Sequence, residues 1–224
     1  MKKYLKIIFS LIVLTIVAGL MVHGNPEIGL VGTGVYAFAP LVGFAPLKWP
    51  AGSENMGGYK NFILFIPADH VSAIPELPIE ITDSDDLVTA TGSFEFKEEG
   101  GVPTYIYATD KSVDYNAENQ GEVDGQSFIQ KGEFAHPGTQ AQAGAFSRRV
   151  NNTPGYVIVE DVDGVQYMCG SKGLPAYIKP AFTGGKARTD KKGFIFTFEA
   201  DSFAPFVILG TPIDIDALEN PVIP

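Results

Sequence analysis

The residues that could carry chemistry are few and scattered. The three histidines, His23, His70 and His136, lie far apart in the chain, and none belongs to an H-x-x-x-H or H-E-x-x-H pattern. No zinc site of these types is therefore predicted. The chain also lacks the G-x-S-x-G elbow of serine hydrolases. Cys169 is the single cysteine, and its apolar neighbours in "VQYMCG" favour a buried, unreactive thiol.

Several short acidic or glycine-rich stretches resemble parts of known sites without completing them. "DSDD" at 83–86 and "EDVDG" at 160–164 look like fragments of calcium loops but lack the ligand spacing and the distal glutamate. Adjacent Glu98 and Glu99 are expected on a solvated turn. "TGGK" at 183–186 lacks the upstream glycine and the strand-to-helix context of a phosphate loop, so we interpret it as a β turn. These patterns predict no enzyme activity, metal or cofactor.

Composition points to a folded, acidic protein with many turns. The chain has 224 residues, 25 Gly and 16 Pro, a hydrophobic content of 45% and a net charge of −10. From Met56 onward there are twelve basic and 24 acidic residues, so the acidic excess belongs to this part. We interpret the basic residues as dispersed. This disfavours a protein that grips nucleic acid through its phosphates.

The elements that must position these residues are mostly short strands. In "GQSFIQKGEF", Phe128 and Phe134 fall on one face with Gly132 between them, and Gly132 marks a bulge or a close approach of another backbone. We expect this strand, 125–134, at or near a subunit contact. "GYVIVEDVDGVQYMCG" predicts a hairpin that turns at Asp163 and Gly164, both with positive φ.

One helix interrupts the strands. Thr139 and Gln142 form a capping-box pattern, and Ala143, Phe146 and Val150 recur at helical spacing. Phe146 is expected to dock the helix on a sheet face. The predicted fold is mainly β, a β-sandwich or barrel with one short flanking α-helix, preceded by a hydrophobic N-terminal segment.

The first 55 residues form a hydrophobic N-terminal segment, and residues 56–224 form the β-rich structural domain. Lys2, Lys3 and Lys6 precede an uncharged run at 7–22, and a second uncharged run spans 28–47. Three interpretations stay open. The runs insert into a membrane, through residues 7–47; the first run is a cleaved signal peptide, which exports the rest; or the segment packs within the protein or its assembly.

The order of elements carries a resemblance. "DGQSFIQKGEFAHPGT", the helix, the hairpin "GYVIVEDVDGVQYMCG" and the closing strand "DKKGFIFTFEADSFAPFVIL" follow one another along the chain. This resembles the major tail-tube proteins of tailed phages and the related tube proteins of contractile injection systems, over about residues 56–216. The resemblance implies a β-sandwich or barrel with one flanking helix that assembles into stacked rings.

On this resemblance, the chain is expected to be a structural virion protein rather than an enzyme. Its partners would be further copies of itself and other virion proteins, with DNA only as passing, non-specific cargo repelled by an acidic lumen. The candidate assembly residues are Phe128, Gly132, Phe134 and Phe146. The alternative is a membrane-anchored or exported β-domain that binds a partner or forms a surface layer.

Overall fold

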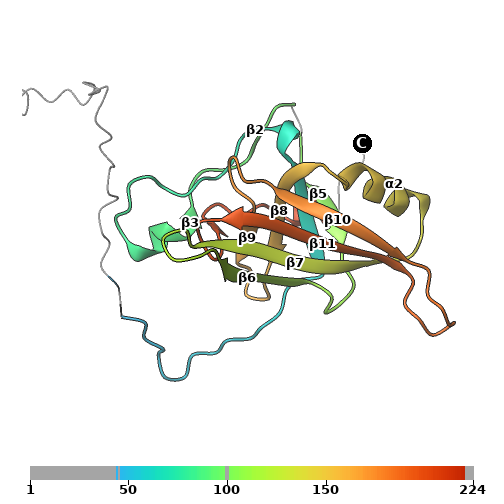
Figure 1. Ribbon diagram of the computed structural model, residues 1–224, viewed down its shortest axis with the longest axis horizontal. Helices are drawn as coiled ribbons and strands as arrows, with labels where there is room; N and C mark the ends of the chain where they lie inside the picture. The colour runs from blue at the N-terminus through green and yellow to red at the C-terminus, as the bar shows by residue number, and fades with distance from the viewer. Residues whose placement is uncertain (1–43, 45, 99–100, 220–224) are drawn as a thin grey trace, which may run out of the picture. The chain divides into compact units, whose positions relative to one another are not determined.

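The computed structural model describes residue 44, residues 46–98 and residues 101–219, all of which belong to one compact unit (Figure 1). The predictions for 7–22 and for nearly all of 28–47 fall outside the described residues and stay predictions. Within the described ranges, no helix is long and apolar enough to cross a bilayer. Residues 46–58 are exposed and contain only a turn, and regular structure begins at Tyr59 and β1.

Strands dominate the described residues, which confirms the predicted fold class. The strands are β1 (Phe62–Pro67), β2 (Val71–Ala73), β3 (Thr89–Ala90), β4 (Glu95–Phe96), β5 (Thr104–Tyr107), β6 (Asp114–Gln120), β7 (Ser127–Pro137), β8 (Pro154–Glu160), β9 (Gln166–Cys169), β10 (Ala176–Thr183), β11 (Gly193–Ser202) and β12 (Ile208–Leu209). The helical elements are the 3₁₀ turns η1 (Ala68–His70) and η2 (Ser84–Leu87), and the α-helices α2 (Ala141–Val150) and α3 (Asp216–Glu219).

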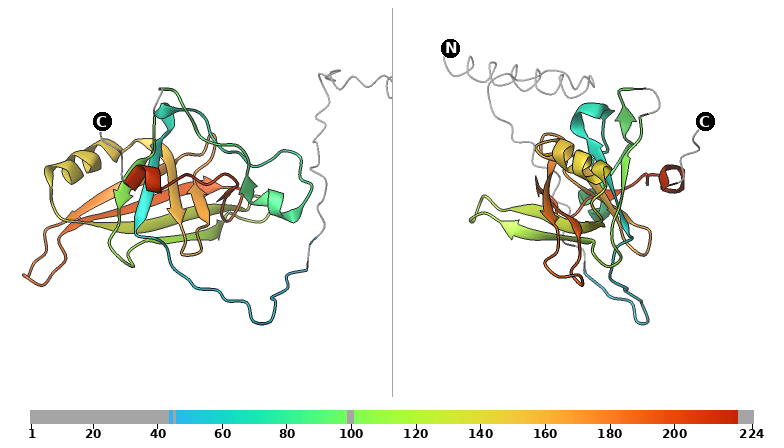
Figure 2. Two further views of the ribbon diagram at one scale, coloured as in Figure 1. Left: turned by 180° about the vertical axis from the view of Figure 1, so that it is seen from behind. Right: turned by 90° about the vertical axis from the view of Figure 1, so that its right-hand side faces the viewer.

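Ten strands form one curled sheet, an open half-barrel (Figures 1 and 2). Its main path runs β5–β1–β8–β10–β11–β7–β6, and at β8 a second branch leads through β9 and β12 to β3. The curl closes in part, because Thr109, just after β5, donates its backbone N–H to the carbonyl of Ala135 in β7 at 2.7 Å. β2 and β4 pair separately as a small two-stranded sheet.

The centre of the sheet is buried on both faces because β1 and β8 are continuous apolar runs. "FILFIP" and "GYVIVE" expose almost none of their side chains, and successive residues of a strand point to opposite faces. One set of alternate residues joins a core inside the curl. The other set joins a second core, which the segments 68–97 and 203–218 cover.

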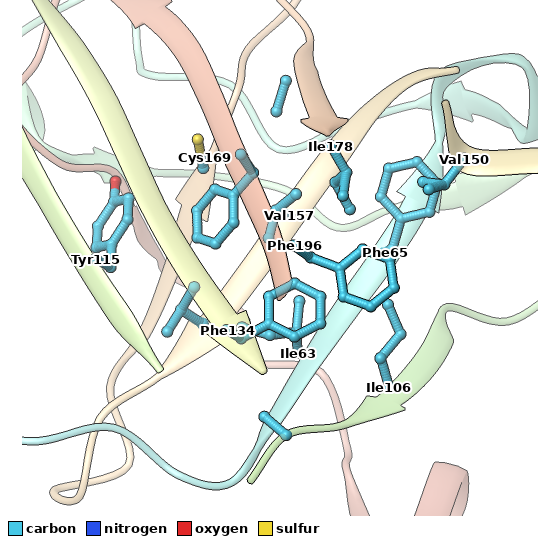
Figure 3. Packing of buried hydrophobic residues seen from close by; sticks show 14 of the residues in the cluster. Ile63, Phe65, Ile106, Tyr115, Phe134, Val150, Val157, Cys169, Ile178 and Phe196 are labelled. Atoms are coloured by element: carbon cyan, nitrogen blue, oxygen red, sulfur yellow. The ribbon is translucent and has the colours of Figure 1, made fainter. Parts of the chain in front are cut away.

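Aromatic rings fill the core inside the curl (Figure 3). Phe134 of β7 and Phe196 of β11 are cross-strand partners whose rings stack with centroids 4.9 Å apart. Phe198 continues the row beside Phe134. These contacts explain the alternation seen in β11, where the even-numbered residues face the core and the odd-numbered ones face outward.

Helix α2 packs against this core through the apolar stripe that the sequence predicted. Ala143 and Val150 are buried, and the Phe146 ring meets Phe196 edge-to-face at 5.8 Å. The predicted capping box does not form. The first helical bond runs from Gly144 N–H to the Gln140 carbonyl, so Gln140 is the N-cap, and its side chain makes no capping bond.

The β8–β9 hairpin has a three-residue loop instead of the predicted two-residue turn. Asp161 and Val165 still pair, since the Asp161 N–H donates to the Val165 carbonyl at 3.0 Å. Gly164 has φ +87°, but Asp163 does not have positive φ. The prediction of positive φ at both residues was therefore wrong. The Asp161 carboxylate accepts the N–H groups of Asp163 and Val165, and this stabilises the longer loop.

Candidate assembly surface

The outer face of β6, β7, β11 and β10 is a broad polar surface. The strand register places four rows of alternate residues on this face, opposite the aromatic core. Helix α2 packs on the core side of the sheet, through Phe146 and Val150. No described helix packs on the outer face, which therefore stays available to water or to another molecule.

Acidic residues outnumber basic ones on this outer face. Its five acidic and two basic side chains give a net charge of −3. Lys131 pairs with Glu118 at 2.6 Å, and Lys179 pairs with Glu199, so three acids have no cation among these rows. These three are Asp114, Glu133 and Asp201, all exposed. Such a surface repels phosphate groups.

Strand β6 ends the sheet with an open edge. Among the described strands, β6 pairs with β7 and with no other. Its backbone N–H and C=O groups on the outer side are open to an added strand, except the Tyr115 carbonyl, which accepts the Tyr59 hydroxyl at 2.9 Å. The central residue, Ala117, is half-buried on the inner face, whereas Asn116 and Glu118 face outward. The edge is long enough for a subunit contact. β7, expected at or near such a contact, is the interior strand next to this edge.

Gly132 marks a close approach of another backbone, one of the two alternatives expected for it. A Cβ at this position would lie 2.1 Å from the Asp114 carbonyl oxygen and 2.5 Å from Cζ of Phe198. The register of β7 against β6 and β11 stays regular through Gly132, so there is no bulge. The missing side chain lets the Phe198 ring lie across β7 directly beneath β6.

The remaining candidate residues divide between surface and core. Phe134 is fully buried in the core of a single chain, so its side chain cannot itself contact another subunit (Figure 3). Phe128 is half-buried near the end of β7, opposite Ser202 and Asn119. Phe146 is half-buried between α2 and the sheet, where it lines two adjoining depressions of about 490 and 430 Å³. Whether any of them serves assembly stays a prediction.

The residues considered for chemistry have structural partners. His136 Nδ1 lies 2.8 Å from the Tyr107 carbonyl, and His70 lies on the surface beside Asp69. Cys169 is completely buried, and this burial raises the pKa of its thiol far above the usual range. Its pKa and inaccessibility make the thiol a poor nucleophile. Among the described residues, no three His, Cys, Asp or Glu side chains gather as a metal site.

The connection between β10 and β11 carries a feature that the sequence analysis missed. Lys186, Arg188, Lys191 and Lys192 lie within seven residues at the tip of this long hairpin, and residues 183–192 are all exposed. The interpretation of the basic residues as dispersed was therefore wrong. Four of the twelve basic residues after Met56 lie in this loop. The close spacing of these four basic residues, in an otherwise acidic chain, could have revealed the cluster from the sequence.

Comparison of the chain with protein-family models, with curated proteins and with solved structures finds no match.

Proposed function

We propose that this protein is a structural, self-assembling subunit whose copies form stacked rings, a tube resembling the tail tube of phages. In this proposal the protein belongs to a virion, its partners are copies of itself and other virion proteins, and DNA passes through the tube without being held. The observation that carries the proposal is the combination of a broad polar outer face with an open seven-residue edge at β6.

The edge supports lateral assembly for a thermodynamic reason. Exposed strand edges are templates for pairing, and monomeric proteins usually block them with bulges, prolines or covering segments. β6 pairs with β7 in regular register throughout, and it contains no proline. A strand from a neighbouring copy would satisfy the outward backbone groups that the Tyr59–Tyr115 hydrogen bond leaves free, and it would continue the sheet into the next subunit.

The charge of the outer face supports its assignment as the lining of the tube. A surface that conducts DNA must not retain the phosphates. The net acidic charge of the β6–β7–β11–β10 face raises the electrostatic energy of a nearby polyanion and so weakens its binding to this face. The paired lysines, Lys131 and Lys179, are partly neutralised by their acidic neighbours, which limits strong phosphate contacts.

Electron microscopy of the purified full-length chain in negative stain tests the proposal. We expect to see rings or tubes, whereas a domain that does not self-assemble would appear as single subunits. The proposed lining predicts that these assemblies do not retain duplex DNA at physiological salt. Monodisperse single subunits at every concentration and salt condition would refute the structural-subunit function.

A second candidate is a membrane-anchored or exported β-domain that binds a partner or forms a surface layer. The observation that favours it is the exposed apolar arm before β1, where Phe44, Leu47 and Trp49 have little or no cover from the described residues. Phe44 and Leu47 belong to the second uncharged run of the N-terminal segment, and Trp49 follows it closely. Anchoring of the full-length chain in membranes, without rings or tubes, would favour this candidate.

A further inference from the structure

The β10–β11 tip is a cationic projection on an acidic protein. Residues 184–192 contain four basic side chains and one acidic side chain, a net charge of +3, against −10 for the whole chain. All of these residues are exposed. None of the four cations forms an ion pair with another described residue. Their charges are therefore available to an external anion.

Backbone hydrogen bonds hold this cationic tip in a defined conformation. The Asp190 carboxylate accepts the N–H groups of Lys186 and Ala187, each at 2.7 Å. These bonds lower the pKa of Asp190 below its usual range. At the base of the tip, the Gly138 N–H donates to the Lys192 carbonyl. The cations are thus presented from an ordered loop, which reduces the entropy lost on docking.

Two acidic segments lie at the other end of the sheet. The segment 80–86 contains four acids, the β6–β7 turn at 121–126 contains two, and neither contains a basic residue. Asp86 accepts the N–H groups of Thr82 and Asp83, and Asp83 accepts that of Ser84. These bonds hold the pKa of Asp86 below its usual range. The acidic segment is therefore also ordered and charged.

The sheet register places the two charged regions at opposite ends. Gly193, beside the tip, pairs with Pro137 at the far end of β7, whereas Ser202 pairs with Phe128 next to the β6–β7 turn. The segment 80–86 leads into β3, which pairs with β12 beyond the end of β11. Figure 1 shows the tip and these acidic segments at opposite ends of the long strands.

We infer that the cationic tip (residues 184–192) of one copy docks on the acidic end (residues 80–86 and 121–126) of a second copy. Opposite charges at opposite ends of one molecule make a head-to-tail contact, which can repeat from one copy to the next. This inference deepens the proposed function, on which it rests. The β6 edge would join copies within a ring, and the tip would join one ring to the next.

Charge-reversal variants of the full-length chain test this contact. The tip variant carries Lys186→Glu and Arg188→Glu, the acidic-end variant carries Asp85→Lys and Glu122→Lys, and a third variant combines all four changes. Each pair of reversals should weaken stacking by about tenfold or more at low salt, because like charges then face each other. The combined variant should recover stacking close to that of the unaltered protein. Sedimentation velocity and electron microscopy measure the outcome.

A matched control reverses two exposed cations away from the tip that also have no recorded ion pair, with Lys48→Glu and Arg148→Glu, and should stack normally. Single rings that no longer stack in the tip variant would support the inference. Normal stacking of the tip variant would overturn the inference while leaving the ring function intact. Absence of rings from the unaltered protein would overturn both. Loss of binding to phosphatidylserine vesicles with unchanged stacking would instead assign the tip to an anionic membrane.

Discussion

At the scale of single residues, the lack of a side chain at Gly132 determines how closely its neighbours pack in the sheet. Gly132 lets the β6 backbone and the Phe198 ring approach one strand from two sides, at distances that no Cβ could accept. These two close contacts explain why a glycine occurs in the middle of this strand, although glycine usually weakens a strand interior. Gly132 therefore acts on packing within the subunit, and it affects assembly by placing the open edge.

We expect Gly132→Ala to destabilise the fold by about 2 kcal/mol, since overpacking forces strands or rings apart. Urea unfolding followed by circular dichroism measures the change. Gly144→Ala is the matched control, because its Cβ would meet nothing within 4 Å in α2. That control should be neutral or stabilise the fold by up to about 1 kcal/mol. Equal stability of both variants would show that the β6–β7 contact relaxes freely.

Buried and half-buried tyrosines should make the fold sensitive to alkali. Burial and a hydrogen bond from the Tyr167 hydroxyl to the Asp161 carboxylate, 3.1 Å long, raise the pKa of Tyr167 to about 12. In the unfolded chain Tyr167 ionises near pH 10, so above this pH the folded state holds more protons than the unfolded state. Its contribution to stability is thus complete below pH 10 and is lost as pH rises towards about 12.

The measurement is the free energy of unfolding in urea as a function of pH, for the unaltered protein and for Tyr167→Phe. We expect a shallower decline above pH 10 in the variant. A residual slope should persist, because burial also raises the pKa of Tyr59 and Tyr156. Identical slopes for the two proteins would mean that Tyr167 ionises in the folded state as easily as in water.

At the scale of elements, the β8–β9 hairpin depends on one left-handed residue. Gly164 has φ +87°, with open space around its Cβ position, so only backbone strain opposes a side chain there. Gly164→Val should destabilise the fold by about 1–2 kcal/mol, the cost of a left-handed conformation for a residue with a Cβ. Gly164→Asn should lose less, because Asn tolerates this region. Chemical denaturation of both variants distinguishes strain from lost packing.

The β6 edge makes a second prediction at this scale. Ala117→Lys should leave the subunit folded, because the long side chain can reach water from the open margin of the sheet. It should prevent strand addition, because pairing would bury the charge. Light scattering and circular dichroism report assembly and folding separately. Ala145→Lys on the exposed face of α2 is the control, and normal assembly of both variants would exclude β6 as the ring contact.

At the scale of the whole molecule, the folded body and the N-terminal segment call for separate tests. The lysines before the run at 7–22 and the lack of charge in 28–47 favour membrane insertion of the full-length chain. We therefore expect this chain in the membrane fraction of expressing cells, and extraction should require detergent. Full-length protein with an intact N-terminus in the soluble fraction would contradict this expectation. That result would support the tube, since the segment would then pack within the protein or its assembly.

The sequence alone determined the mainly β class and the local elements. Alternating Phe residues predicted β11, the apolar runs predicted β8 and β9, and the spacing of Ala143, Phe146 and Val150 predicted the docked face of α2. These features follow from the period of each backbone conformation, which neighbouring residues reveal. The buried Cys169 was predicted for the same reason, from its apolar strand.

Only the tertiary structure decided which predicted residues are exposed and which edge is open. Phe128 and Phe134 share a face of β7, yet only Phe134 is fully buried, because Phe196 lies opposite it. The open edge at β6 depends on strand order, and the separation of the cationic tip from the acidic end depends on register. Strand order and register both depend on pairing between residues far apart in the chain. The period of a local sequence pattern contains no information about such pairing.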